Sequence, residues 1–355
     1  MPTRVITLKG SARERGRQLG EALREHFLSS FAATQAAKPD NPERVQATIA
    51  YMAGECPLLL DEVNGVADAL ALTPGQVLRT QLYPGWAELQ NRGGCTEAAA
   101  ITTDAGPVMF QTGDSSLTPG LMEQLQEDEV LVQQVVPDEG PRWVSVGSST
   151  HPFVLFGLNE EGLARIGQLG QSEKRSVPRK TGLPYLLSDR HVLNTARNVE
   201  EATGVLERLV FVGRAKAMIL VDASGTMRCM EKWQGRTGRR EADANYIYQA
   251  NDFITPEMSD LADHNQNTKD RHRELGQLFA KAEAEDDLTL DRMWRILKHH
   301  ASESGSICRH GQPDPVDDGA VSALSMFAKC RDRELYFTWG HTPCEGQYRK
   351  LTIDF

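Results

Sequence analysis

The stretch Asn91-Arg92-Gly93-Gly94-Cys95-Thr96-Glu97 divides this chain into two parts of different character. Glycines before a cysteine indicate a turn, and the run that follows, Thr96-Glu97-Ala98-Ala99-Ala100-Ile101-Thr102-Thr103, predicts a buried strand. Residues 1–94 are predicted to be mostly helical, whereas residues 95–355 are predicted to be rich in strands. The sequence therefore places the Cys95 side chain at the exposed start of a β-sheet.

The first part carries apolar residues at a helical period. They recur every four positions in a helix expected over about residues 12–37, and further helices are expected over 42–54 and 57–70. Gly16 and Gly20 lie four apart on or near the apolar face. Glycine costs about 1 kcal/mol in a helix interior, so this spacing predicts close packing against another element.

The second part contains strand patterns separated by turn signals, which predicts hairpins of antiparallel sheets. Helices are expected over residues 184–195 and over about 268–285 and 289–301. A further helix is expected to begin at Asn198, which forms a capping box with Glu201. Segregated helices and antiparallel strands predict an α+β layered fold. The expected strands cover residues 3–8, 96–103, 107–111, 129–136, 142–147, 153–157, 162–167, 216–222, 226–232, 245–250, 320–328, 333–339 and 347–353.

Composition narrows the class of protein. The formal net charge is -10, from 49 acidic and 39 basic residues, with no basic block of five or more. Nucleic acids and anionic membranes bind basic patches, so neither is an expected partner. No apolar run approaches the roughly 18–20 residues that span a bilayer, and residues 1–8 show no signal-peptide core, so we expect a cytoplasmic protein.

The six cysteines do not follow a zinc-finger pattern, because none forms a CxxC pair and their spacings are irregular. We therefore expect no metal, and we interpret Cys308, Cys330 and Cys344 as packed, reduced thiols. The sequence also lacks the GxGxxG and GxxxxGK[ST] loops of nucleotide sites, and no cofactor is expected.

Cys95 needs a base before its thiol can act as a nucleophile. If the Gly94-Cys95 bond is cut, the freed α-amino group has a pKa near 8 and can take that proton. Glycine at 94 would let the thiol approach the carbonyl carbon. The segment 106–114 reads as a hairpin partner of the Cys95 strand, which would return Asp114 toward the nucleophile.

The order and spacing of several short motifs resemble those of a known family. The chain resembles the acyl-coenzyme A:6-aminopenicillanate acyltransferase family of N-terminal-nucleophile hydrolases, also grouped as the C45 peptidases. The motifs are the segment 10–20, Glu62-Val63-Asn64-Gly65-Val66-Ala67, Gly94-Cys95-Thr96, Gly157-Leu158-Asn159-Glu160-Glu161-Gly162-Leu163, Val221-Asp222-Ala223-Ser224-Gly225 with Glu231, Gln249-Ala250-Asn251-Asp252-Phe253, Ser306-Ile307-Cys308-Arg309-His310 and Gly340-His341-Thr342-Pro343-Cys344.

The resemblance implies a four-layer αββα sandwich and self-cleavage before Cys95. Residues 1–94 would become an α fragment and residues 95–355 a β fragment of one domain. Cys95 carries over as the nucleophile within the cleavage motif Gly94-Cys95-Thr96, Asn251 as an oxyanion donor, and Asp114 as an aspartate that hydrogen-bonds near the site.

Three residues depart from the family pattern. Gly113 stands where the asparagine-x-aspartate strand motif usually has a larger residue. Ala250 and Asp252 replace the threonine and histidine that usually flank the asparagine. The local hydrogen bonding around Asn251 is therefore expected to differ from that of other members.

Arg309 and His310 are candidates for substrate binding, because an arginine binds carboxylates and a histidine shuttles protons. The alternative is that both brace a loop. Arg271 is interpreted as a surface or capping residue of its polar helix. The pair His299-His300 is interpreted as complementing a helix dipole.

The expected activity is that of a self-processing cysteine amidohydrolase acting on a small linear amide. Acyl transfer from a coenzyme A thioester is the first alternative, and a catalytically silent binding module is another. A third alternative is an uncut cysteine–histidine hydrolase whose base is His151, His310 or His341. The sequence does not identify the acyl group, the amine or the oligomeric state.

Overall fold

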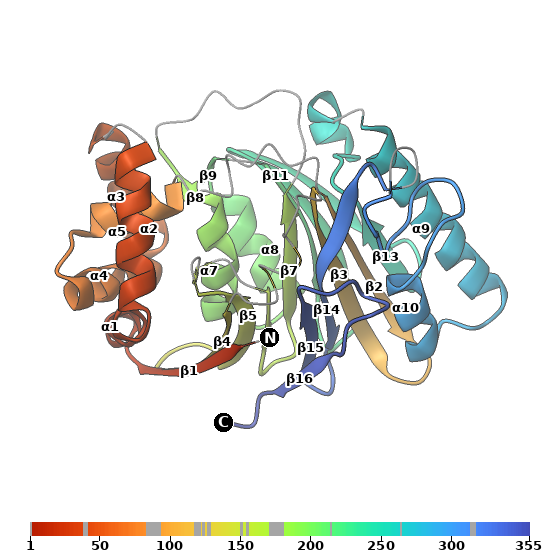
Figure 1. The fold of residues 1–355 in the computed structure, drawn as a ribbon, viewed down its shortest axis with the longest axis horizontal. Helices are drawn as coiled ribbons and strands as arrows, with labels where there is room; N and C mark the ends of the chain where they lie inside the picture. The colour runs from red at the N-terminus through yellow and green to blue at the C-terminus, as the bar shows by residue number, and fades with distance from the viewer. Residues whose placement is uncertain are drawn as a thin grey trace.

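Two β-sheets lie face to face between two helical layers, as Figure 1 shows for the computed structural model. This arrangement confirms the predicted four-layer α+β fold. The structure describes residues 2–37, 42–82, 94–116, 122, 125, 129–149, 152–153, 156–169, 181–213, 215–262, 265–312 and 317–355. Within them, no helix is long and apolar enough to cross a membrane.

The first sheet has the order β1-β4-β5-β6-β7-β10-β11-β12. Its neighbours are antiparallel except β1 and β4, which pair in parallel. The fold was predicted as antiparallel, so this edge pair is a difference. The strands are β1 Thr3–Gly10, β4 Val130–Pro137, β5 Trp143–Ser148, β6 Phe156–Asn159, β7 Ala164–Leu169, β10 Lys216–Val221, β11 Met227–Trp233 and β12 Arg236–Glu241.

The second sheet has the order β13-β2-β3-β14-β15-β16 and is antiparallel throughout. A short parallel pair, β8 Leu183–Pro184 and β9 Phe211–Val212, lies apart from both sheets. The strands of the second sheet are β13 Tyr246–Gln249, β2 Cys95–Thr102, β3 Gly106–Ser116, β14 Ala320–Lys329, β15 Glu334–Trp339 and β16 Arg349–Thr352.

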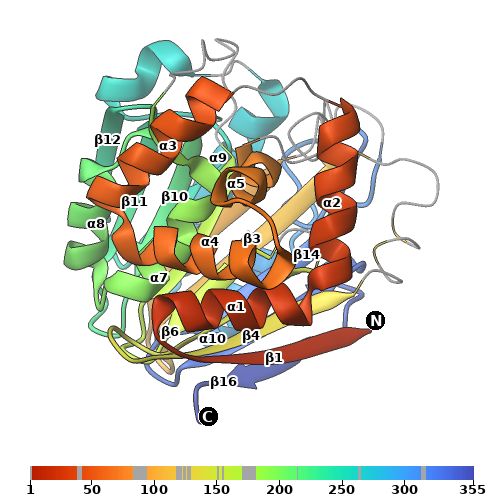
Figure 2. The ribbon, with the colours of Figure 1, turned by 90° about the vertical axis from the view of Figure 1, so that its left-hand side faces the viewer.

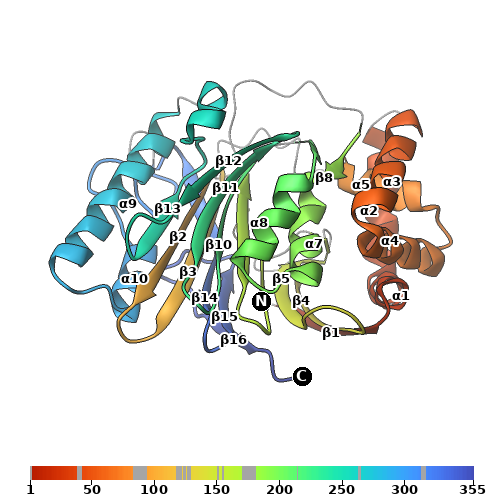
Figure 3. The same cartoon turned by 180° about the vertical axis from the view of Figure 1, so that it is seen from behind.

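Helices cover the outer face of each sheet, and Figure 3 shows α7 and α8 on one side and α9 and α10 on the other. The first side holds α1 Ala12–Ala22, α2 Arg24–Ala37, α3 Pro42–Glu55, α4 Pro57–Leu70, α5 Pro74–Leu82, the 3-10 turn η2 Tyr185–Leu187, α7 Ser188–Thr195 and α8 Val199–Arg208. The second side holds α9 Gln266–Ala284 and α10 Leu290–Leu297, and the 3-10 turn η3 Pro256–Leu261 packs against β12.

Side-chain alternation along β2 fixes the direction in which the Cys95 side chain points. Ala99 belongs to the apolar layer between the two sheets, whereas Ala98 and Ala100 pack against the α9–α10 side. Successive side chains of a strand point to opposite faces. The Cys95 side chain therefore faces the inter-sheet layer, and the Thr96 side chain faces the helices.

The predicted close packing of Gly16 is confirmed in the contact of α1 with α4, which lie side by side in Figure 2. A Cβ on Gly16 would lie 2.0 Å from the carbonyl oxygen of Glu62, and a Cβ on Gly65 would lie 2.0 Å from that of Arg13. The two backbones approach so closely that neither helix tolerates a larger residue there. Gly20 likewise faces Ala69, at 2.9 Å.

A buried ionic cluster joins the N-terminal helices to the rest of the molecule. The Glu62 carboxylate of α4 accepts from Arg15 of α1 at 2.8 Å and from Arg190 of α7 at 2.5 Å. Burial alone would raise the pKa of Glu62, but the two guanidinium charges outweigh it and lower that pKa. Residues 1–94 are thus held to the remaining chain by non-covalent contacts.

The helix predicted over residues 12–37 is instead two helices that meet at Leu23. Leu23 has φ -118° and ψ 24°, outside the helical region. The carbonyl of Ala22 accepts a hydrogen bond of 2.7 Å from Arg4 of β1, so it is bonded outside its own helix. This partner comes from another element, and the helical period alone could not predict the break.

Other predictions need smaller corrections. The strand predicted over 107–111 extends to Ser116, and the helix predicted over 184–195 begins with η2, so that α7 starts at Ser188. Helix α5 and strand β12 were missed, the latter because its residues are mostly charged, as an edge strand permits. Most of the turn predicted before Cys95 lies outside the described residues, which resume at Gly94.

Candidate active site around Cys95

Cys95 is the first residue of β2 and is partly buried. Its backbone nitrogen donates a hydrogen bond of 2.8 Å to Oδ1 of Asn251, which follows β13. Because β13 pairs with β2, the two residues lie at the same end of the second sheet. The structure therefore brings together the predicted nucleophile and the predicted oxyanion donor.

The carbonyl of Gly94 has a donor placed against it. The backbone N–H of Asp114 donates to this oxygen at 2.6 Å. The β2–β3 register pairs Cys95 with Gly113, so the hairpin returns Asp114 to the level of Gly94. This confirms the predicted course of the hairpin, and it adds that the backbone of Asp114 makes the contact.

The Asp114 carboxylate is engaged on the other side. Oδ1 accepts from the hydroxyl of Ser322 at 2.7 Å, and Oδ2 accepts from Nη1 of Arg309 at 3.3 Å. Both charged side chains are almost fully buried. This ion pair fixes the end of β3 and with it the N–H that faces Gly94.

Gly94 is surrounded so closely that a side chain has no room. A Cβ at this position would lie 2.6 Å from Oδ1 of Asn251 and 2.7 Å from Nη2 of Arg271. Both distances are well below ordinary van der Waals contact. The packing around Gly94 therefore requires a glycine before Cys95.

Arg271 is a site residue that the sequence analysis missed, because it was interpreted as a surface or capping residue of α9. It is 1% exposed. Its Nη1 donates to the carbonyl oxygen of Cys95 at 2.6 Å and to Oγ1 of Thr96 at 2.7 Å, and its Nη2 donates to Oδ1 of Asn251 at 2.9 Å. One guanidinium thus fixes both Cys95 and Asn251, its neighbour across the sheet.

Burial lowers the pKa of Arg271 to about 10, and the nearby charge of Arg309 acts in the same direction. The group still carries its positive charge at neutral pH. Asn267 holds it in place from the same helix, since its Oδ1 accepts from Nε of Arg271 at 3.0 Å. A fixed positive charge therefore lies beside the backbone of Cys95.

The loop that carries Asn251 is tied to β11 by Glu231. The buried Glu231 carboxylate accepts from the backbone of Ile254 at 2.8 Å and of Thr255 at 3.1 Å, and from the Thr255 hydroxyl at 2.6 Å. Asp252, one of the departures from the family pattern, accepts from the N–H of Phe253 at 2.9 Å. These contacts hold the segment in which Asn251 lies.

The structure gives a physical reason for another departure, Gly113. A Cβ there would lie 2.8 Å from the side chain of Leu324 on β14. The register of β14 shifts between Ser322 and Leu324, so the strand is irregular at this point. Leu324 thus occupies the space into which a larger residue at 113 would project.

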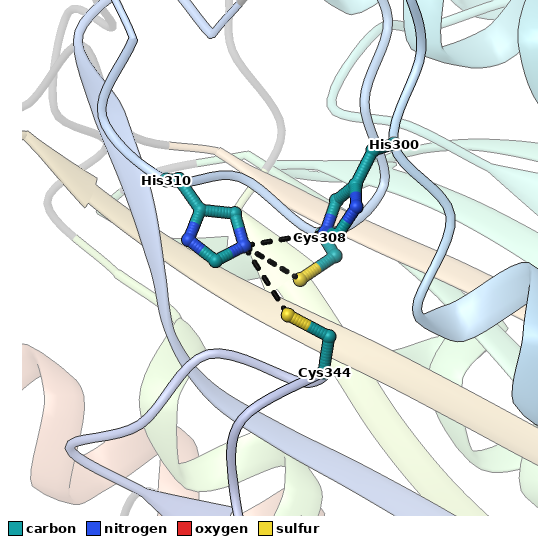
Figure 4. Close-up of side chains that lie close together, drawn as sticks. All are labelled: His300, Cys308, His310 and Cys344. Carbon is teal, nitrogen blue, oxygen red and sulfur yellow. Dashed lines mark hydrogen bonds between the residues drawn. The ribbon is translucent and has the colours of Figure 1, made fainter.

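Arg309 and His310 lie in different surroundings, although they are neighbours in sequence. Arg309 is 1% exposed and donates to Asp114 and to the carbonyl oxygen of Asp317, contacts that hold protein groups in place. His310 is part of a cluster with His300, Cys308 and Cys344, shown in Figure 4. The alternative that both residues brace a loop agrees with these contacts.

Glu97 adds an ionisable group on β2, two residues after Cys95. It is fully buried, and its Oε2 accepts from the N–H of Ile219 in the other sheet at 2.9 Å. Burial raises the pKa of Glu97 to about 8, although Arg165 and Lys216 partly oppose the shift. Near neutral pH this carboxyl group is therefore mostly protonated.

Comparison with known proteins gives a family match over about two thirds of the chain. Residues 106–342 match the family model described as acyl-coenzyme A:6-aminopenicillanic acid acyl-transferase. A search of curated proteins returned no significant match.

Solved structures share a distant likeness. A mutant of the conjugated bile acid hydrolase from Clostridium perfringens is 12% identical, with a TM-score of 0.49, and the alignment covers 73% of this chain and 92% of that one. A second variant of that hydrolase gives 12% and 0.47, covering 73% and 93%. Penicillin V acylase from Agrobacterium tumefaciens gives 13% and 0.42, covering 73% and 86%.

Proposed function

Because the chain belongs to the acyl-coenzyme A:6-aminopenicillanic acid acyl-transferase family, we propose that it is a self-processing cysteine enzyme that hydrolyses or transfers acyl groups. The observation that carries this proposal is the set of contacts at the Gly94-Cys95 peptide. Its carbonyl oxygen accepts from the N–H of Asp114 at 2.6 Å, and its nitrogen donates to Asn251 at 2.8 Å. Hydrogen bonds therefore hold both the carbonyl group and the nitrogen of the peptide bond that would be cut.

The cleavage would proceed by attack of the Cys95 sulfur on the carbonyl carbon of Gly94. The oxyanion that forms would lie against the N–H of Asp114, which already donates to that oxygen. Collapse forms a thioester between Gly94 and the Cys95 sulfur, breaks the peptide bond, and passes the thiol proton to the departing nitrogen. Water then hydrolyses the thioester, leaving the Gly94 carboxylate and a free Cys95.

After cleavage the Cys95 nitrogen would become an α-amino group and could act as the base for its own thiol. The amide oxygen of Asn251, which accepts from this nitrogen, would orient the amine. The positive charge of Arg271, bonded to the Cys95 carbonyl, favours the neutral form of a nearby amine. Arg271 therefore favours an unprotonated α-amine near neutral pH, and Asn251 fixes the orientation of that amine.

The substrate oxyanion requires donors close to the Cys95 sulfur. Asn251 accepts through Oδ1 from both Cys95 and Arg271, so its amide nitrogen points the other way. We assign that nitrogen, with the Asp114 N–H once Gly94 has left, to the carbonyl oxygen of the substrate. The same site would thus serve first the chain itself and then an external acyl group.

The substrate class that we favour is a small linear amide, whose C–N bond is hydrolysed through an acyl-enzyme at Cys95. Acyl transfer from a coenzyme A thioester is the second candidate, favoured by the description of the family. The two fragments would stay together through contacts such as the Glu62–Arg190 pair. No metal is needed for either reaction, since the thiol and amine supply the nucleophile and the base.

Turnover by mature protein tests the proposal against a panel of linear amides and acyl thioesters. We expect a covalent acyl adduct on Cys95, seen by mass spectrometry, and loss of turnover in Cys95→Ala. Cys56→Ala is the matched control, because burial raises the pKa of this remote thiol to about 12 and makes it inert. Turnover that survives in Cys95→Ala would overturn the assignment.

The panel also separates the alternatives. A cysteine–histidine enzyme would turn over as an uncut chain, whereas a binding module would be inactive on both substrate classes. Of the histidines considered as its base, His151 lies outside the described residues, and His310 is placed against Cys344 at 3.3 Å. Release of product only when an amine acceptor is present would identify acyl transfer.

A further inference from the structure

Three side chains of the segment that follows α10 converge with one side chain of the C-terminal segment. They are His300, Cys308, His310 and Cys344, and Figure 4 shows them turned toward one another. One nitrogen or sulfur atom from each lies within 4.8 Å of the other three. From the sequence we interpreted Cys308 and Cys344 as packed thiols, and the reaction proposed above uses none of the four side chains.

The contacts of His310 exceed what hydrogen bonding explains. Its Nε2 lies 3.2 Å from Nε2 of His300, 3.3 Å from Sγ of Cys344 and 3.6 Å from Sγ of Cys308. An imidazole nitrogen has either one hydrogen or one lone pair, and so it can satisfy one such partner. Three donor atoms around one ring nitrogen require another reason to lie there.

A metal ion at the centre of the four atoms supplies that reason. Tetrahedral zinc has bonds of about 2.0–2.1 Å to nitrogen and about 2.3 Å to sulfur, which places two nitrogens about 3.3 Å apart and a nitrogen and a sulfur about 3.6 Å apart. The three observed distances agree with these edges to within about 0.3 Å. Two cysteines and two histidines form a ligand set that selects zinc.

We propose that His300, Cys308, His310 and Cys344 bind a zinc ion as a structural Cys2His2 site. All four positions are filled by protein, and a closed site of this kind stabilises structure and leaves no position for a substrate. Zinc displaces the protons of Cys308 and Cys344, so that two thiolates and two neutral imidazoles hold the ion.

The surrounding contacts agree with a built site. The N–H groups of His310 and Gln312 both donate to Oδ2 of Asp317, at 2.9 and 3.2 Å, which fixes the ligand loop. The N–H of Cys308 donates to the carbonyl oxygen of His299 at 3.0 Å, which holds Cys308 beside the segment of His300. Backbone contacts thus hold three of the ligands independently of their side chains.

The site would also brace the reaction centre. Arg309 lies between two of the ligands and donates to the Asp114 carboxylate at 3.3 Å. A metal bound by Cys308 and His310 would therefore fix the backbone on both sides of Arg309. We assign the metal this positioning role and no direct contact with substrate.

Metal binding by the whole reduced protein tests the proposal. Protein stripped with a chelator is reloaded with Zn²⁺, dialysed and measured for zinc, and Co²⁺ loading is followed by its thiolate charge-transfer absorption. We expect one metal per chain in the wild type and affinity at least about 100-fold weaker in His300→Gln and Cys344→Ser. His299→Gln is the matched control, because that side chain contacts Glu274 instead.

The results distinguish a specific zinc site from adventitious zinc binding and from a disulfide. Stoichiometric zinc in the wild type and in His299→Gln, with a rise in melting temperature that His300→Gln lacks, supports the site. Equal zinc in all variants would show adventitious binding and overturn the proposal. Reduced protein that binds no zinc, together with a Cys308–Cys344 disulfide before reduction, would overturn it in favour of a cystine.

Discussion

The replacement Gly94→Ala tests the geometry of the site without removing any of its chemical groups. The new methyl carbon would start 2.6 Å from Oδ1 of Asn251 and 2.7 Å from Nη2 of Arg271. To restore contacts of about 3.4 Å, these atoms must move by roughly 0.7–0.8 Å. The movement disturbs the hydrogen bonds that hold the backbone of Cys95.

The expected cost can be derived from this displacement. A misplacement of about 1 Å in a reacting group costs about 100-fold in rate, so we expect self-cleavage of Gly94→Ala to be slower by about that factor. Overpacking of a buried site typically costs about 1–3 kcal/mol, which leaves the fold intact. Because the Cys95 thiol is unchanged, slower cleavage would show that the positions of the surrounding groups control the rate.

The assay follows the fraction of cut chain against time by intact mass, with far-ultraviolet circular dichroism and thermal melting to confirm folding. Gly54→Ala is the matched control, since a Cβ on Gly54 meets no atom within 4 Å. We expect the control to mature like the wild type. A folded Gly94→Ala protein that matures at the wild-type rate would show that the close contacts at Gly94 do not control cleavage.

Three further predictions follow from single contacts. Arg271→Lys keeps the charge but cannot donate to Cys95, Thr96 and Asn251 together, so self-cleavage should slow about 100-fold in a time course; an unchanged rate would contradict this. Asp114→Asn breaks the ion pair with Arg309 but keeps the N–H that faces Gly94 and an oxygen that can accept from Ser322. Cleavage should therefore slow yet persist while urea unfolding shows a loss of about 3 kcal/mol, and abolished cleavage in a folded variant would count against a backbone role. For Glu97, burial raises the pKa in the folded protein from its ordinary 4.5 to about 8, so the stabilising effect of this group is complete below pH 4.5 and is lost as pH rises to about 8. In the wild type the free energy of unfolding, measured by urea, should fall by on the order of 4 kcal/mol between pH 4.5 and 8.5, and Glu97→Gln should remove this fall. An equal fall in both proteins would show that Glu97 is not its cause.

Local signals predicted much of the fold. Alternation and turn residues marked the hairpins, and the change in pattern at Cys95 marked β2, a strand of the second sheet. The spacing of Gly16 and Gly20 predicted a close contact, which the structure shows to be with α4. Local patterns do not say which strands pair with each other, so they could not predict the parallel pairing of β1 with β4.

The site was predictable where one short motif carries it and was missed where the groups meet only in three dimensions. Gly94 and Cys95 are adjacent, and a hairpin brings Asp114 beside them. Arg271 lies 176 positions from Cys95. The first half of its helix, residues 266–274, is entirely polar, so no local pattern marks Arg271 as buried. A search for adjacent ligand types, such as Cys308 and His310 two positions apart, could have raised the question of a metal.

The most direct measurement is the intact mass of the purified wild-type protein under denaturing conditions, beside Cys95→Ala. A cut before Cys95 divides the 355 residues into fragments of 94 and 261 (355 − 94), which by proportion of 39.3 kDa have masses of roughly 10 and 29 kDa. We expect these two masses, with Cys95 as the new terminus, in the wild type alone. An uncut wild-type chain that is fully active, or equal cutting of Cys95→Ala, would contradict this expectation.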